Sequence, residues 1–177
     1  MKLVILSSSP RINGNSDRLC QELARGAEEN GNEVVTLHIS QMQIGTCKGC
    51  EYCHSHENQC IQKDDMQKVL AILSDADVVA VATPVYYYNV CAQLKLFFDR
   101  TYCMYKEFNF KKTIFLATSQ AKAQSAMDVP IAGYMGWVRC LPDTTSIGEV
   151  TATGVYEMDE IEGHPALKQA YELGKSL

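Results

Sequence analysis

The first sixteen residues constrain the fold of this chain more than any other stretch. Leu3–Ser7 is a short apolar run that predicts a buried strand, and residues 8–16 follow it as Ser-Ser-Pro-Arg-Ile-Asn-Gly-Asn-Ser. A helical pattern then begins at Ser16 and ends before Gly31. A buried strand that passes through a hydroxyl- and amide-rich loop into a helix predicts an anion cradle, because the unpaired N–H groups of the helix start point at the anion.

The residue types of this loop indicate which anion it holds. Ser9, Asn15 and Ser16 offer side-chain hydrogen-bond donors, and Arg11 adds a fixed positive charge. The loop has neither the G-x-G-x-x-G fingerprint of dinucleotide sites nor the G-x-x-x-x-G-K-[ST] loop of nucleotide triphosphate sites. A cradle of Ser, Asn and Arg side chains suits one terminal phosphate, such as that of FMN. The alternative is an ordinary turn in which Asn15 or Ser16 only caps the helix.

Length and charge limit the classes of protein to which the chain belongs. With 177 residues, 46% of them hydrophobic, it is long enough for a proper core, and no linker or composition break divides residues 1–177 into two domains. The formal net charge of -5 argues against nucleic acid as a partner, because binding a phosphate backbone needs a basic surface. No segment approaches the ~20 apolar residues of a membrane helix, and the N-terminal run lacks the features of a signal peptide. We therefore expect a cytoplasmic protein without a membrane partner.

The rest of the chain alternates between strand-like and helix-like patterns. Further strands are predicted at Glu33–His38, 76–82, Thr113–Thr118 and Thr145–Thr153, and helices at Asp64–Ser74, Asn89–Tyr105, 126–138 and Pro165–Ser176. This alternation predicts a doubly wound α/β domain, with a five-stranded parallel sheet and helices on both of its faces. Such sheets bind ligands outside the carboxyl ends of their strands, where the loops after Ser7, Ala82 and Thr118 should meet.

The loop after the third predicted strand, residues 83–90, reads Thr-Pro-Val-Tyr-Tyr-Tyr-Asn-Val. Neighbouring residues of a loop point in different directions, so at least one of the three tyrosines should be exposed near the cleft. A planar aromatic ring system needs flat apolar faces and backbone donors at its polar edge. The alternative is that the tyrosines pack beneath the loop and Asn89 caps the next helix. The phosphate loop at the same sheet edge favours contact with a flavin.

Four of the eight cysteines form a compact run within residues 45–63, with the spacing Cys47-x2-Cys50-x2-Cys53-x6-Cys60. Closely spaced thiolates suit a [4Fe-4S] cluster or a tetrahedral zinc ion, and His54 and His56 keep zinc open as an alternative. Thiols without a metal are the third alternative. The other cysteines are predicted to be small packing residues in or near helices, namely Cys20, Cys91, Cys103 and Cys140.

Three motifs resemble those of the NADPH-dependent FMN reductase group of flavodoxin-like proteins. They are Ser-Pro-Arg-x-x-Gly-Asn-Ser at 9–16, Thr-Pro-Val-Tyr-Tyr at 83–87, and Ala-Gln-Leu-Lys through Asp-Arg at 92–100. The cysteine run, which ends in Asp64-Asp65-Met66, resembles the iron–sulfur flavoprotein branch of that group. The resemblance covers most of residues 1–105. It departs from the group at 118–122, where relatives often have glycines and this chain has Thr-Ser-Gln-Ala-Lys.

The resemblance implies a flavodoxin-like fold of strand order 2-1-3-4-5 that binds FMN non-covalently. The phosphate would lie against Ser9, Arg11, Asn15 and Ser16, and the isoalloxazine ring against Pro84, Val85, Tyr86, Tyr87 and Asn89. Thr118 and Ser119 of the third loop, together with Asn13, complete the candidate set for the cofactor. The resemblance also implies a [4Fe-4S] cluster at Cys47, Cys50, Cys53 and Cys60. It further implies a homodimer or homotetramer, for which 102–105 with Phe108 and Phe110 is the predicted subunit surface.

The chain is therefore predicted to be an FMN-dependent oxidoreductase that takes electrons from NADH or NADPH and passes them to a small-molecule or protein acceptor. Because the flavin carries this chemistry, no protein acid or base is predicted to be catalytic. One alternative is an iron–sulfur flavoprotein that carries electrons between a ferredoxin-like donor and an acceptor through a [4Fe-4S] cluster. A second alternative is a non-enzymatic sensor whose exposed thiols report redox state.

Overall fold

Five parallel strands form the centre of the computed structural model, which describes residues 1–177. They are β1 (Lys2–Ser7), β2 (Glu33–His38), β3 (Val78–Tyr86), β5 (Lys112–Ser119) and β6 (Thr145–Thr153). They follow the order β2-β1-β3-β5-β6, and the two-residue strand β4 (Asn89–Val90) pairs antiparallel with the end of β3. Counted without β4, the parallel strands have the order 2-1-3-4-5, so the predicted flavodoxin-like topology is confirmed.

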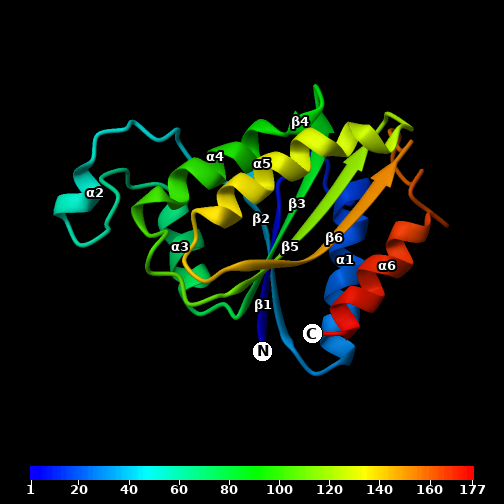
Figure 1. Cartoon of the computed structure of the whole chain (residues 1–177), viewed down its shortest axis with the longest axis horizontal. Helices are drawn as coiled ribbons and strands as arrows, with labels where there is room; N and C mark the ends of the chain where they lie inside the picture. Colours follow the sequence, from blue (N-terminus) through cyan, green and yellow to red (C-terminus); the bar gives the residue numbers. More distant parts are fainter.

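Helices cover both faces of the sheet (Figure 1). On one face lie α1 (Asn15–Glu29) and α6 (Pro165–Lys175), and on the other lie α3 (Met66–Ser74), α4 (Ala92–Arg100) and α5 (Asp128–Arg139). The short elements are α2 (Tyr52–Ser55) and the 3-10 turns η1 (Ile39–Gln41), η2 (Thr101–Cys103) and η3 (Gln124–Met127). The loop that carries α2 extends away from the sheet. None of these helices has the length and apolar character needed to span a membrane.

The central strands β1, β3 and β5 bury both of their faces, as parallel strands between two helical layers should, whereas the edge strands β2 and β6 are partly exposed. Leu3 and Ile5 of β1 belong to the core cluster beneath α1 and α6, whereas Val4 and Leu6 belong to the larger cluster beneath α3, α4 and α5. This alternation divides the core into two halves separated by the sheet. The carboxyl ends of β1, β3 and β5 consequently end at one edge, between the two helical layers.

The structure differs from the predicted long helix at Asn89–Tyr105. Tyr87 and Tyr88 both have positive φ, at 50° and 58°, and form a tight turn that returns the chain as β4. Two positive φ values at the central positions define the hairpin turn whose twist matches the flanking strands. The helix therefore begins at Ala92, after Cys91, and ends at Arg100, where η2 follows.

Two predictions about buried and exposed side chains are wrong. Phe108 and Phe110 are only 5% and 1% exposed, and they stack on each other beside Trp137, so they belong to the core and not to a subunit surface. The chain turns inward there, between η2 and β5. Cys140 is exposed in the turn after α5 and does not pack. The other three predicted packing cysteines, Cys20, Cys91 and Cys103, are buried as expected.

Helices α1 and α6 approach each other through two glycines. A Cβ atom added to Gly26 would lie 2.1 Å from the carbonyl oxygen of Tyr171, and one added to Gly174 would lie 2.1 Å from that of Leu23. Both obstructions are backbone atoms, which cannot rotate away as a flexible side chain can. The absence of a side chain at these positions therefore sets the distance between the two helices.

Gly26→Ala is expected to lower the free energy of unfolding by about 3 kcal/mol, because the added methyl group forces α1 and α6 apart. Gly136→Ala is the matched control, since Gly136 is also helical but has no atom within 4 Å of the added Cβ. The control should raise the free energy of unfolding by up to about 1 kcal/mol through helix propensity. Urea denaturation followed by circular dichroism measures both changes, and equal stability of the two variants would contradict the prediction.

Candidate cofactor site

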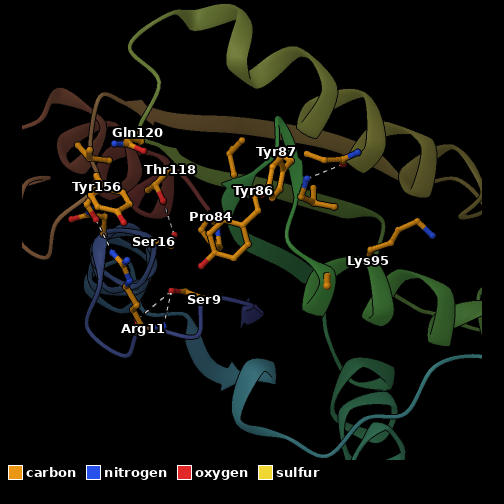
Figure 2. Close-up of a pocket in the computed structure, with 16 residues that line it drawn as sticks. Ser9, Arg11, Ser16, Pro84, Tyr86, Tyr87, Lys95, Thr118, Gln120 and Tyr156 are labelled. Carbon is orange, nitrogen blue, oxygen red and sulfur yellow. Dashed lines mark hydrogen bonds between the residues drawn. The ribbon is translucent and has the colours of Figure 1, made fainter.

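A cavity of about 910 Å³ opens at the edge of the sheet where β1, β3 and β5 end (Figure 2). Ten of the twelve predicted cofactor residues line it, namely Ser9, Arg11, Asn15, Ser16, Pro84, Val85, Tyr86, Tyr87, Asn89 and Thr118. The other two predicted residues, Asn13 and Ser119, do not line the cavity. Asn13 turns its side chain toward Gln21, and the hydroxyl of Ser119 accepts a hydrogen bond from the Ala121 N–H.

One end of the cavity is formed by the first turn of α1. No hydrogen bond within the chain uses the backbone N–H groups of Asn15, Ser16 or Asp17. The N-cap residue is Gly14, which provides no side-chain cap. The alternative in which Asn15 or Ser16 merely caps the helix is therefore wrong, and the unpaired N–H groups carry the positive end of the helix dipole.

The loop that precedes α1 is held in place by its own hydrogen bonds. The Ser8 hydroxyl donates to the carbonyl oxygen of Ala82 at 2.6 Å, and the Ser40 hydroxyl donates to that of Ser9 at 2.6 Å. The Ser9 hydroxyl accepts from the Arg11 N–H at 3.2 Å. The Ser16 hydroxyl lies 2.7 Å from that of Thr118, which joins the first loop to the third. The polar end of the cavity is thus preformed.

A segment that the sequence did not single out completes this end. Arg11 donates from Nη1 to the carbonyl oxygen of Tyr156 at 2.8 Å, and its guanidinium lies 5.1 Å from the centre of the Tyr156 ring. Asn15 donates from Nδ2 to the carbonyl oxygen of Glu157 at 2.9 Å. Further lining residues absent from the prediction are Val90, Ala92, Lys95, Gln120 and Val155. Figure 2 shows Lys95 at the opposite end of the cavity from Arg11.

The other end of the cavity is aromatic. Tyr87 is fully exposed and Tyr88 largely so, which confirms the prediction that at least one tyrosine of this loop is exposed. Asn89 uses its side-chain oxygen to accept from the Val90 N–H and lies in β4, so it does not cap the next helix. Partial burial raises the pKa of Tyr86, and its hydroxyl therefore stays protonated at neutral pH.

The cysteine run lies beside a second, smaller cavity of about 30 Å³. All four predicted ligands line it, together with a fifth thiol, Cys103. Thiolates are suitable donors for iron or zinc. As the side chains stand, however, no group of three or more His, Cys, Asp or Glu residues is arranged to hold a metal ion. His56 stacks on Tyr52, with 3.6 Å between ring centres.

A buried ion pair fixes both ends of the cysteine loop to α4. Arg100 is 2% exposed and donates to both carboxylate oxygens of Asp64, at 2.6 Å and 3.0 Å. It also donates to the carbonyl oxygen of Gly45 at 2.7 Å, while the Gly45 N–H donates to Asp64 at 2.9 Å. The second Nη of Arg100 lies 3.6 Å from the sulfur of Cys60.

Burial raises the pKa of Cys103 to about 11, so this fifth thiol stays protonated.

Helix α4 connects the two cavities. Ala92 and Lys95 line the large cavity, whereas Asp99 and Arg100 line the small one. A rise of 1.5 Å per residue separates Ala92 from Asp99 by about 10 Å along the helix. The two sites therefore lie at opposite ends of one short, rigid element.

The sheet order and the two helical layers define a flavodoxin-like protein, with a preformed polar cavity at the carboxyl ends of its strands. Residues 1–139 match the model of the NADPH-dependent FMN reductase family, and the chain belongs to this family. Membership makes it an FMN-dependent oxidoreductase. The resemblance on which the sequence prediction relied is thereby confirmed.

Individual relatives agree with this assignment. An iron–sulfur flavoprotein of Archaeoglobus fulgidus is 32% identical over 177 residues, which are 100% of this chain and 79% of the relative. An iron–sulfur flavoprotein of Methanosarcina thermophila is 35% identical over 120 residues, which are 67% of this chain and 62% of the relative. Less than two thirds of that protein is therefore matched. The solved structure of an NAD(P)H:quinone oxidoreductase from Methanothermobacter marburgensis has a TM-score of 0.74 and 15% identity, covering 99% of this chain and 95% of that one, and it supports the fold alone.

Proposed function

We propose that the large cavity holds FMN and that the protein transfers electrons from NADH or NADPH to a small-molecule or protein acceptor. The observation that carries this proposal is the first turn of α1, where three backbone N–H groups have no hydrogen-bond partner in the chain and where Asn15 and Ser16 line a preformed polar cavity. A helix start of this kind binds a phosphate through its N–H groups and its dipole. The cavity also has the volume of a cofactor site.

At the polar end, Ser9 and Ser16 present hydroxyl groups and Arg11 presents a permanent positive charge to the phosphate. Arg11 and Asn15 are also bonded to the carbonyl oxygens of Tyr156 and Glu157. These bonds hold the segment after β6 against the loop before α1, so both form the wall of the proposed phosphate site. We assign the phosphate to Ser9, Arg11, Asn15 and Ser16 on this arrangement.

At the aromatic end, Pro84 and Val85 provide an apolar edge, and Tyr86 and Tyr87 provide flat faces for the isoalloxazine ring. Asn89 and Thr118 add polar groups beside them. FMN supplies the hydride and single-electron chemistry when bound, and these side chains orient it and exclude water. No protein acid or base is assigned a catalytic role.

The test begins with the apoprotein. Calorimetric titration should show FMN binding at least about tenfold more tightly than riboflavin, because riboflavin lacks the charged phosphate. Anaerobic addition of NADPH or NADH to the FMN-loaded protein should then bleach the flavin absorption. Absence of FMN binding would contradict the whole proposal. FMN binding without reduction by either nucleotide would contradict only the donor, and would favour a ferredoxin-like donor.

A second candidate function is electron transfer through a [4Fe-4S] cluster. The observation that favours it is that all four predicted ligands line one small cavity, in a loop that Arg100 fixes to α4. The thiols must move to surround a cluster, because they do not form a metal-holding group as they stand. Iron, sulfide, zinc and flavin assays on anaerobically purified protein test this function, and about four irons per FMN are expected for four thiolate ligands. Protein with flavin and no iron would exclude it.

A further inference from the structure

Asp17 is a buried carboxylate directly behind the anion site, although it does not line the cavity. It is 1% exposed and is the third residue of α1. One of its oxygens accepts a hydrogen bond from the Ser7 hydroxyl, and the other accepts from the backbone N–H of Asn13 at 2.8 Å. The side chain thus reaches back past the N-cap residue Gly14 to the loop itself.

These two bonds join the ends of the loop that precedes α1. Ser7 is the last residue of β1, and Asn13 is the last residue before the N-cap. Asn13 has a φ of 59°, in the left-handed region that a residue with a side chain adopts only at a cost. The bond from its N–H to Asp17 holds this conformation. The direction in which the chain enters α1 is thereby fixed.

The charge of Asp17 does not explain its position. A carboxylate so close to an anion site repels the phosphate, and burying it is costly unless hydrogen bonds compensate. The one basic side chain within 4 Å is the imidazole of His38, whose Nδ1 lies 3.6 Å from the carboxylate and makes no hydrogen bond. What Asp17 contributes is therefore two acceptor oxygens in a fixed geometry.

We propose that Asp17 is a positioning residue of the phosphate site. By fixing Ser7 and Asn13, it holds the loop so that the unpaired N–H groups of Asn15 and Ser16 point into the cavity. The inference rests on the proposed binding of FMN. If Asp17 positions the phosphate site, its loss should weaken binding of FMN more than binding of riboflavin. A merely structural role would weaken the binding of both flavins equally.

The test compares two variants of Asp17 with a matched control. Asp17→Ala removes both bonds and should weaken FMN binding about tenfold or more, while riboflavin affinity stays near the wild-type value. Asp17→Asn should restore FMN binding, because its oxygen accepts from Asn13 and its amide donates to Ser7. Asp77→Ala is the control, since Asp77 accepts from the Lys2 N–H at 2.7 Å at the opposite edge of the sheet and should not affect either flavin.

Amide hydrogen exchange of the apoprotein separates this inference from the proposed function. The Asn13 amide should exchange about tenfold faster or more in Asp17→Ala than in the wild type or in Asp77→Ala. If Asp17→Ala does not fold, Ser7→Ala removes one of the two bonds and should give a smaller loss of FMN affinity. Unchanged exchange, equal losses for FMN and riboflavin, or a failure of Asp17→Asn to recover FMN binding would each overturn the positioning role. A wild-type protein that binds neither flavin would overturn the proposed function, and the phosphate role with it.

Discussion

Asp64→Ala is expected to lower the free energy of unfolding by about 3–5 kcal/mol, because it leaves the buried charge of Arg100 without a partner. Arg100, the last residue of α4, is buried, and Asp64 accepts two of its hydrogen bonds. Asp64 also accepts from the Gly45 N–H. The substitution therefore also releases the start of the cysteine loop from its end.

Urea denaturation measures this loss. The same substitution made in the Arg100→Met variant shows whether the unpaired charge of Arg100 is its cause. Asp64→Ala should cost far less when Arg100 is already replaced by Met, because no buried charge then remains unpaired. Asp65→Ala is the neighbouring control. Asp65 forms a solvent-accessible pair with Lys68 at 2.8 Å and accepts from the Gln43 N–H at 2.9 Å, but it pairs with no buried charge, so its removal should cost much less than that of Asp64. A cost for Asp64→Ala as small as that of the control would contradict the importance of the ion pair.

The same ion pair predicts a dependence of stability on pH. Burial on its own raises the pKa of Asp64, but hydrogen bonds from Arg100 and from the Gly45 N–H outweigh it and hold the pKa below its ordinary value. A carboxyl whose pKa is lower in the folded state stabilises the fold fully above its unfolded pKa of about 3.9 and loses this contribution as the pH falls further. The stability difference between the wild type and Asp64→Ala should therefore be largest near neutral pH and shrink below about pH 4.

The parts of the fold that the sequence predicted correctly depend on local signals. The strand, loop and helix of residues 3–30 are continuous in the chain, and each has its own pattern of apolar and polar residues. Strands that alternate with helices leave few possible topologies, and parallel strands bring their following loops to one edge. Pro84, Tyr87 and Thr118 could therefore be placed near Ser16 without any knowledge of their contacts.

The features that the sequence missed depend on contacts between distant residues or on an unusual backbone. Tyr87 and Tyr88 occupy a turn where Asn and Gly are the usual residues, so the sequence has no signal for the turn, and the predicted helix begins at Asn89, where the structure has β4. Tyr156 lies at the site beside Arg11, which is 145 residues earlier and donates to its carbonyl oxygen. Arg100 and Asp64 are 36 residues apart, and no local pattern pairs them.

Ser16→Asp is expected to weaken FMN binding by about 100-fold or more, because a carboxylate at this position faces the phosphate. Ser16 is 2% exposed, and its hydroxyl is already within 2.7 Å of Thr118 inside the cavity wall. Two like charges about 4 Å apart repel by roughly 4 kcal/mol at an effective dielectric constant near 20, and about 2.7 kcal/mol suffices for a 100-fold loss. Riboflavin, which has no phosphate, should bind the variant nearly as well as it binds the wild type.

Matched variants show whether the position of the added charge, and not only its presence, weakens FMN binding. Ser125→Asp adds the same negative charge at an exposed residue of η3 and should leave FMN affinity unchanged. Ser16→Ala removes the hydroxyl without adding charge and should cost only about tenfold. Circular dichroism of each apoprotein checks that the variant folds. If Ser16→Asp weakened FMN and riboflavin equally, the first turn of α1 would not face the phosphate, and the anion site on which the proposed function rests would have to lie elsewhere in the cavity.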